Sequence, residues 1–178
     1  MSDFVASLSY LSFSDGWGWS LLRGLASTVQ IALGAFALGL LIGLGGALGK
    51  RHGSAPLRWL LEIYTTLIRA VPELVLILLL YYAGTQLINE ALASFGYRPI
   101  DISGLVAGIA VLGIVQGAYA TEVIRGAMRA VPRGQIEAAQ AFGMRPSTVL
   151  RRVTLPAMIP FALPGLANLW LIVLKDTA

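Results

Sequence analysis

The chain has 178 residues, of which 57% are hydrophobic and only 12% are charged. Soluble domains have about a quarter of their residues charged, so this composition excludes an ordinary water-soluble enzyme and a disordered chain, and argues against a nucleic-acid binder. With no cysteine and one histidine, His52, the sequence offers no disulfide framework, no thiolate metal site and little for a zinc centre or a histidine-based triad.

The first membrane span is predicted over residues 24–49, a run without a charged side chain. A bilayer core of about 30 Å requires about 20 helical residues. This run is too long and starts too late for a cleaved signal peptide, whose apolar part has about 7–15 residues. It contains two GxxxG pairs, Gly39 with Gly43 and Gly45 with Gly49, which favour close packing of helices in lipid rather than a dedicated dimerisation face.

Three further spans follow, over residues 67–89, 102–124 and 157–174. The second has Arg69 and Glu73 in its first turns. Backbone groups inside lipid must be satisfied within their own segment, so these runs are predicted to be helices. The short alternating stretches of a transmembrane β-barrel are absent from the sequence. The predicted fold class is therefore an all-α membrane bundle.

Basic residues are distributed unevenly over the predicted loops. Nine of them fall between spans one and two or between spans three and four, namely Lys50, Arg51, Arg58, Arg125, Arg129, Arg133, Arg145, Arg151 and Arg152. On the other side lie only Arg23 and Arg98. The positive-inside rule places the nine in the cytoplasm and the N-terminus outside. Four spans then leave the end of the chain at the outer face, so a fifth span is expected beyond residue 178.

The segment 125–152, which we call the elbow, has a pattern beyond its positive charge. Charge alone is explained by a basic surface against anionic lipid headgroups. However, Pro132 suits a first helical position and Gly143 suits a helix end, after which Pro146 opens a second short helix to about residue 152. A helix–glycine–helix unit of this kind is suited to insertion into a groove of another protein.

The elbow resembles the EAA loop of ABC importer permeases, which reads Glu-Ala-Ala, three residues, Gly, nine residues, Ile-x-Leu-Pro. The chain departs from it at Val153, where the loop has isoleucine. A match of this length inside a membrane protein is specific. The resemblance implies that an ATPase subunit docks on the matching residues, which are Glu137, Ala138, Ala139, Gly143, Leu155 and Pro156.

The likeness extends over nearly the whole chain from about residue 22. Segments 64–73 and 117–126 are similar to the second and third spans of the polar amino acid uptake subfamily, with Ala70 in place of the usual glycine, and residues 174–178 match the segment before its last helix. Within that subfamily the chain most resembles permeases for histidine, arginine, lysine and ornithine, and for opines. The resemblance implies a type I ABC importer permease bundle of five spans.

The same resemblance implies the partners. A dimer of ABC ATPase subunits would bind ATP and Mg, a second permease chain, identical or related, would complete the pore, and a periplasmic or lipid-anchored binding protein would deliver substrate at the cell inner membrane. The chain itself is predicted to bind no cofactor and to be no enzyme, because residues 44–51 lack the first Gly and the final Ser or Thr of a Walker phosphate loop. We expect contact with lipid and none with nucleic acid.

Polar and ionisable side chains inside the spans are candidates for a substrate pathway. The candidates are Glu122, Arg69, Glu73, Gln116 and Asn168. Glu122 could attract the cationic end of a basic amino acid, but an ion pair with Arg69, or with Arg125 three residues further on, is the favoured interpretation. Arg69 could equally bind the carboxylate of the substrate, because a guanidinium binds carboxylates in a two-pronged geometry.

Three prolines in the fourth span, Pro156, Pro160 and Pro164, share one helical face. They predict an irregular start to this span.

Two alternatives to a basic amino acid permease remain open. One is a permease for another polar amino acid such as glutamine. The other is an ion-coupled secondary transporter, which would need sites at broken helices and no docking elbow. An intramembrane enzyme built on Glu122 and Arg69 lacks a nucleophile or a metal set.

Overall fold

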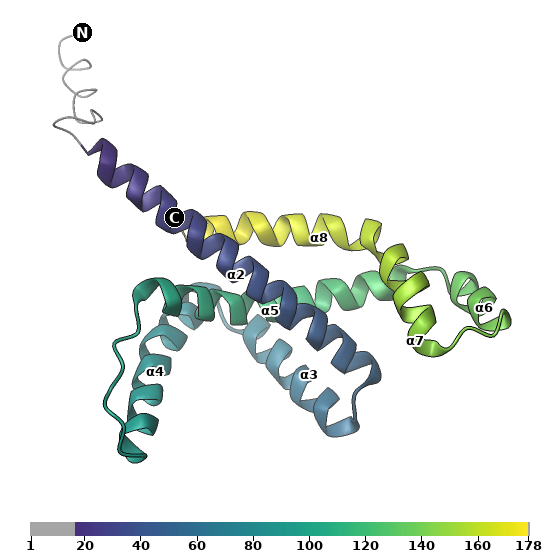
Figure 1. Ribbon diagram of the computed structural model, residues 1–178, viewed down its shortest axis with the longest axis horizontal. Helices are drawn as coiled ribbons and strands as arrows, with labels where there is room; N and C mark the ends of the chain where they lie inside the picture. Colours follow the sequence, from purple (N-terminus) through teal and green to yellow (C-terminus); the bar gives the residue numbers. More distant parts are fainter. Residues whose placement is uncertain (1–16, 178) are drawn as a thin grey trace, which may run out of the picture.

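The computed structural model describes residues 17–177, and these residues are helical with short connections. In chain order the helices are α2 (Gly18–His52), α3 (Ala55–Ala70), α4 (Glu73–Ser94), α5 (Gly104–Ala130), α6 (Arg133–Ala141), α7 (Pro146–Val149), the π-helix η1 (Leu150–Thr154) and α8 (Leu155–Asp176) (Figure 1). Among residues 17–177, four helical segments are long and apolar enough to cross a membrane: α2, α4, α5 and the continuous stretch Pro146–Asp176. The prediction of an all-α membrane protein with four spans is confirmed.

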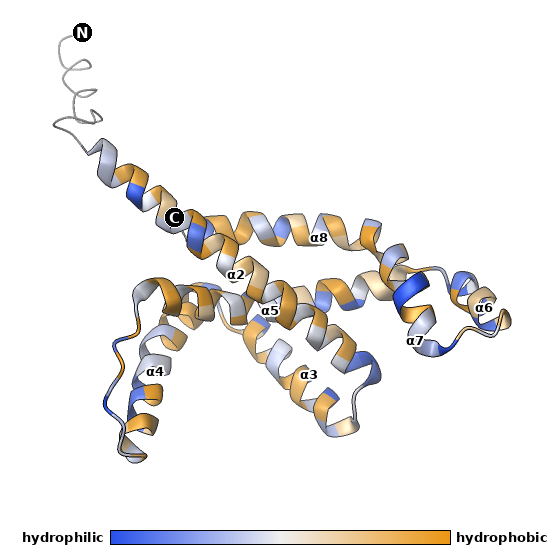
Figure 2. Ribbon diagram, viewed as in Figure 1, coloured by the Kyte–Doolittle hydropathy of each residue, from blue (hydrophilic) through white to orange (hydrophobic). Residues whose placement is uncertain are grey.

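Helix α5 lies at the centre of the molecule, with α2 crossing it and α8 along its side (Figure 1). Helices α3 and α4 form an inverted V against α5, and α6 and α7 project at one end. The end of α8 returns to α2, where the Thr28 hydroxyl donates a hydrogen bond of 3.2 Å to the carbonyl of Thr177. Apolar residues cover the outside of the long helices, which suits a lipid environment (Figure 2).

Glycines let α2 approach α5 closely. A methyl group at Gly43 would lie 2.5 Å from the Cβ of Ala120, and one at Gly39 would lie 2.9 Å from the Cβ of Gln116. This GxxxG pair therefore packs two helices of the same chain, as predicted. The second predicted pair behaves differently, because a methyl group at Gly45 would meet nothing within 4 Å.

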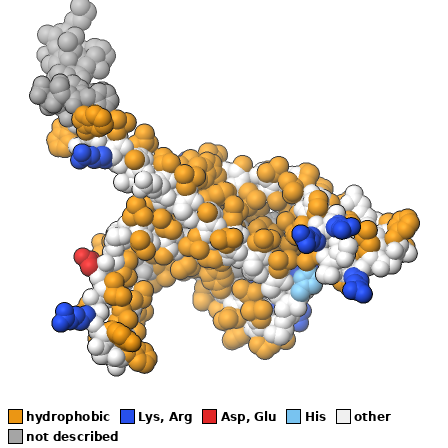
Figure 3. Space-filling view, in the orientation of Figure 1, with side chains coloured by type: hydrophobic (Ala, Val, Ile, Leu, Met, Phe, Trp, Pro, Cys, Tyr) orange, Lys and Arg blue, Asp and Glu red, His pale blue; other side chains and the backbone are white. Residues whose placement is uncertain are grey.

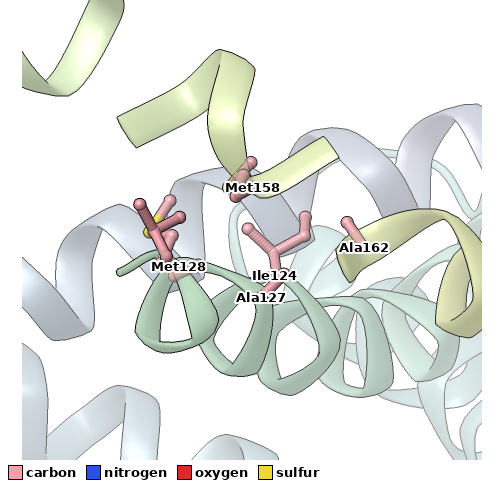
Figure 4. Close-up of a cluster of buried hydrophobic side chains, with 7 residues drawn as sticks. Ile124, Ala127, Met128, Met158 and Ala162 are labelled. Carbon is pink, nitrogen blue, oxygen red and sulfur yellow. The ribbon is translucent and has the colours of Figure 1, made fainter. Parts of the chain in front are cut away.

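A close-packed apolar cluster, which we call the Met128 cluster, joins the elbow end of the bundle. Its buried members are Ala47, Ile124, Ala127, Met128, Val131, Met158 and Ala162. Figure 4 shows three of the α5 side chains facing Met158 and Ala162 of α8. Because these side chains contact one another across three helices, the ends of α2 and α5 and the start of α8 are held together.

The predicted start of the second span at residue 67 is wrong. Helix α3 ends at Ala70, Val71 and Pro72 are extended with ψ of 139° and 131°, and α4 begins at Glu73. Proline disfavours a helical conformation for the residue before it, which explains the break. Arg69 therefore lies in the last turn of α3 rather than in the second span.

The break lies beside the middle of α5. Ile68 and Leu76, on either side of it, pack against Val115 and Ala118. The Tyr64 hydroxyl also donates a hydrogen bond to the carbonyl of Ile114. Glu73 is thus placed beside the middle of α5, in the first turn of the second span as predicted.

Span four has the irregular start that its prolines predicted. Helix α7 continues through η1 into α8, and the backbone N–H of Leu155 bonds to the carbonyl of Leu150, five residues back. Pro156 cannot donate to the carbonyl four residues before it, and the wider π turn accommodates this loss. The second elbow helix and the fourth span are therefore one helical path, not two helices as predicted.

The ends of the other elements differ from prediction by smaller amounts. Pro132 is the residue before α6 rather than its first residue. Ala178, the last residue of the segment matched at 174–178, lies outside the described residues. The fifth span expected beyond residue 178 stays a prediction.

Candidate functional site

The turn of the elbow is built on Gly143. After α6 the N–H of Gly143 bonds to the carbonyl of Gln140 at 2.8 Å, and the N–H of Met144 bonds to the carbonyl of Ala139 at 3.2 Å. This pair of bonds is the Schellman motif, which needs a left-handed residue at its centre. Gly143 has φ of +75°, so glycine adopts here a conformation that is strained for other residues. The predicted end of the helix at this residue is confirmed.

The matching residues of the elbow are not equally exposed. Glu137, Ala138, Gly143 and Pro156 are exposed, Ala139 is buried, and Leu155 packs against the Met128 cluster. The tip carries Phe142, which is 88% exposed. Basic side chains gather on the same end of the molecule (Figure 3). The elbow thus presents two large apolar side chains, Phe142 and Met144, and one acid on a basic surface. ATPase docking on it stays a prediction.

A charged group, which we call the Lys50 network, connects α2, α3 and α5. The side chain of Lys50 is only 3% exposed, and its Nζ lies 2.7 Å from Glu122 Oε1, 2.7 Å from Glu62 Oε2 and 2.6 Å from Thr65 Oγ1. Sequence reasoning placed Lys50 in a loop, but α2 continues to His52. A buried ammonium group with three acceptors is expensive to disrupt, because losing it leaves carboxylates uncompensated.

Glu122 also has a second cation. Its Oε2 accepts a hydrogen bond of 3.0 Å from Arg125 Nε, and the two side chains form an ion pair. The predicted pairing three residues along the helix is therefore present, whereas Arg69 does not contact Glu122 through any ion pair of the described residues. Two cations of the chain itself neutralise this acid.

Glu73 and Asp176, which we call the carboxyl pair, lie at the start of α4 and the end of α8. Their side chains lie close to one another, and Tyr119 of α5 lies near both and near Arg69. Within the described residues, Glu73 Oε1 is buried and has no hydrogen-bond partner. Two neighbouring carboxyl groups are a site that a cation would neutralise.

Sequence reasoning did not select Asp176 as a site residue. The sequence shows only that Asp176 follows a long apolar run. Such a run does not indicate which other helix the acid will contact. Its neighbour in space is 103 positions earlier in the chain (176 − 73 = 103). Only the break at residues 71–72 brings the two acids to the same level of the bundle.

The remaining two candidates, Gln116 and Asn168, are not members of the carboxyl pair or of the Lys50 network. Gln116 is 1% exposed, its Cβ lies close to Gly39, and its amide has no hydrogen-bond partner within the described residues. Asn168 is exposed on α8. The structure thus places Glu73 and Arg69 near the same residue, Tyr119. The roles of all five candidates in a pathway stay predictions.

The family model for "Binding-protein-dependent transport system inner membrane component" matches residues 35–178. The chain belongs to this family. The match includes the elbow, the Met128 cluster and both acidic groups, so the features described above lie in the region that the family shares.

Individual members of this permease family are similar over most of the chain. The chain is 45% identical to the histidine/lysine/arginine/ornithine transport system permease protein HisQ of Escherichia coli (strain K12), over 92% of this chain and 72% of the relative. It is 44% identical to the nopaline transport system permease protein NocQ of Agrobacterium fabrum (strain C58 / ATCC 33970), over 96% and 74%. A solved structure titled "Crystal structure of an amino acid ABC transporter with histidines" matches with a TM-score of 0.70 and 34% identity, over 88% of this chain and 68% of that one.

Proposed function

We propose that the chain is the permease subunit of an ATP-driven importer for basic amino acids in the cell inner membrane, with its N-terminus outside. ATP and Mg bind to a dimer of separate ATPase subunits, which dock on the elbow. A second permease chain, identical or related, completes the pathway, and a periplasmic or lipid-anchored binding protein delivers the substrate. The observation that carries this proposal is an exposed elbow whose second helix continues without a break into the fourth membrane helix.

The elbow is placed so that a displacement reaches the membrane helices. On one side it continues as a single helical path to Asp176, and on the other Val131 and Ile136 contact the Met128 cluster. Because a helix is stiff along its axis and the cluster is close-packed, a force on α6 acts on α5 and α8 together. Closure of the ATPase subunits on ATP then rocks these helices from an inward-facing to an outward-facing arrangement.

The carboxyl pair supports a basic substrate. Two neighbouring carboxyl groups are costly to ionise together, and an ammonium or guanidinium group between them would neutralise both. Arg69 lies near enough to act on Tyr119, and it suits the carboxylate of an amino acid. The relatives named for histidine, lysine, arginine, ornithine and nopaline agree with this substrate class. Glu122, already neutralised by Lys50 and Arg125, is assigned a structural role.

Two glycines with the same backbone strain provide the test of the docking elbow. Gly143 and Gly96 have φ of +75° and +79°, and a methyl group at either would meet no atom within 4 Å. Gly96 lies in the connection between α4 and α5, at the other end of the molecule (Figure 1). Gly143→Val and Gly96→Val should therefore cost the same stability, about 1–2 kcal/mol.

Only Gly143→Val should reduce ATP-dependent uptake of arginine and the amount of ATPase that co-purifies with the chain. Both are measured in the complete transporter, with the protein level of each variant as the reference. If the two variants lower uptake equally, or if Gly143→Val keeps both uptake and the ATPase, the elbow is not where the ATPase acts.

A further inference from the structure

A cavity of about 430 Å³ lies where the end of α2, the end of α5 and the start of α6 meet. Five basic side chains line it: Lys50, Arg51, Arg125, Arg129 and Arg133. The remaining lining is apolar and consists of Met128, Val131 and Ile136. We call this space the basic cavity. It is separate from the carboxyl pair and from the exposed tip of the elbow.

The positive charge of the basic cavity is not compensated by the chain. Lys50 and Arg125 are paired with acids in the Lys50 network. Arg51, Arg129 and Arg133 have no ion pair with any described residue, although they come from three different helices. Three guanidinium groups around one cavity form a site for an anion that accepts several hydrogen bonds, as a phosphate does.

The apolar lining indicates what kind of phosphate fits. Met128 and Val131 are each 3% exposed, and Ile136 packs on the same cluster, so this part of the wall is fixed. Ile136 is the partly exposed member of this wall, and a small inorganic anion would leave it uncovered. A phospholipid instead joins a phosphate to a less polar glycerol ester, which matches a cavity with cations on one side and apolar side chains on the other. Basic pockets between membrane helices are known to suit such headgroups.

We propose that the basic cavity binds the phosphate headgroup of an anionic phospholipid. The headgroup accepts hydrogen bonds from Arg51 of α2, Arg129 of α5 and Arg133 of α6, while its glycerol region lies against Met128 and Val131. A lipid bound there connects the first residue of the first elbow helix to the ends of two membrane helices. It therefore holds the elbow in position on the bundle.

The test compares two triple variants of the complete transporter, purified in detergent with the subunits that accompany the chain. One variant changes Arg51, Arg129 and Arg133 to glutamine. The control changes Arg58, Arg145 and Arg151 to glutamine, which removes the same charge from exposed residues outside the basic cavity. Native mass spectrometry measures retained phosphatidylglycerol and phosphatidylcholine, and glycerol phosphate is added as a soluble competitor.

The wild-type transporter and the control should each retain phosphatidylglycerol in preference to phosphatidylcholine. The cavity variant should bind it about a hundredfold more weakly, since each basic residue near an anionic headgroup contributes to binding. Millimolar glycerol phosphate should not displace the lipid. Changing the same three residues to lysine keeps the charge and the fold, and should restore part of the binding.

Three results would overturn the proposal. Equal losses in the two glutamine variants would assign lipid binding to the general surface charge. Displacement by glycerol phosphate at the same concentration as the lipid would identify a soluble phosphate compound as the ligand. Retention of the lipid by the chain alone, but not by the transporter with its other subunits, would show that an acidic residue of a partner protein fills the cavity.

Discussion

The Lys50 network and the carboxyl pair contain the same kind of side chain in opposite states. Glu122 lies 2.7 Å from a buried ammonium group and also pairs with Arg125. Glu73 and Asp176 face one another, and no cation of the described residues forms an ion pair with them. Both groups lie on the surface of α5, only a short distance along the helix from one another.

The difference shows how a membrane permease separates structure from transport. A charge in a medium of low dielectric constant must be compensated, and a cation of the chain does this permanently. If instead the negative charge of an acid is neutralised by a mobile cation, the electrostatic free energy of that acid changes when the cation binds or leaves. The contrast therefore predicts that the two groups respond differently to substitution.

The largest effect is expected from Lys50→Met, which leaves Glu62 and Glu122 without their shared cation. Because the ammonium group is 3% exposed, we expect the free energy of unfolding to fall by about 3 kcal/mol. Thermal unfolding of the purified chain in detergent measures this. Lys175→Met, at an exposed position, is the matched control, and an equal Tm for the two variants would contradict a structural role for the network.

The next largest effect is expected from the double variant Glu73→Gln, Asp176→Asn. It should leave Tm unchanged or raised, because two repelling acids are removed, while uptake of arginine falls about thirtyfold. The fall in uptake is measured with labelled arginine in a competition assay. Glu90→Gln, an acid hydrogen-bonded to Gln86 on α4, is the control that should transport normally. Normal arginine uptake by the double variant would assign the carboxyl pair to structure alone.

A smaller effect is expected from Arg69→Lys. Lysine keeps the charge but loses the two-pronged geometry, so the apparent KM for arginine should rise about fivefold with little change in Tm. Uptake at increasing arginine concentration separates this effect from a change in maximal rate. An unchanged KM would mean that Arg69 does not bind the carboxylate of the substrate.

The smallest effect on substrate choice is expected from Glu122→Gln. Since Lys50 and Arg125 already neutralise Glu122, its replacement should change the preference between arginine and glutamine by less than about twofold. The variant should still lower Tm, because the buried Lys50 loses one partner. A clear shift towards neutral amino acids would return Glu122 to the substrate pathway.

The sequence predicts the features that depend on local chemistry. Long apolar runs give the four spans, and Gly143 followed by Pro146 gives the turn of the elbow. The three prolines of span four predict an irregular start, although the type of irregularity, a π-helix, depends on which carbonyls remain free. The i+3 spacing of Glu122 and Arg125 is likewise visible in the sequence.

The features that the sequence does not predict depend on distant parts of the chain. Lys50 directly follows a charge-free run, so the sequence predicts that it lies in a loop. Instead α2 continues past it, and its ammonium group is buried beside Glu62 and Glu122, which are distant in the sequence. The extended pair at 71–72 moves Glu73 to the level of Asp176. Both outcomes follow from the packing of whole helices, which a periodic pattern does not contain.

The central claim is that the tip of the elbow faces the cytoplasm and is covered by an ATPase. The chain has no cysteine, so Phe142→Cys places a single thiol at the most exposed part of the tip, and Tyr97→Cys places one at the other end of the molecule. A membrane-impermeant maleimide should label Tyr97→Cys in intact cells. It should label Phe142→Cys only in inside-out vesicles, and there only when the ATPase is absent. Labelling of Phe142→Cys from outside the cell, or equal labelling with and without the ATPase, would contradict the account.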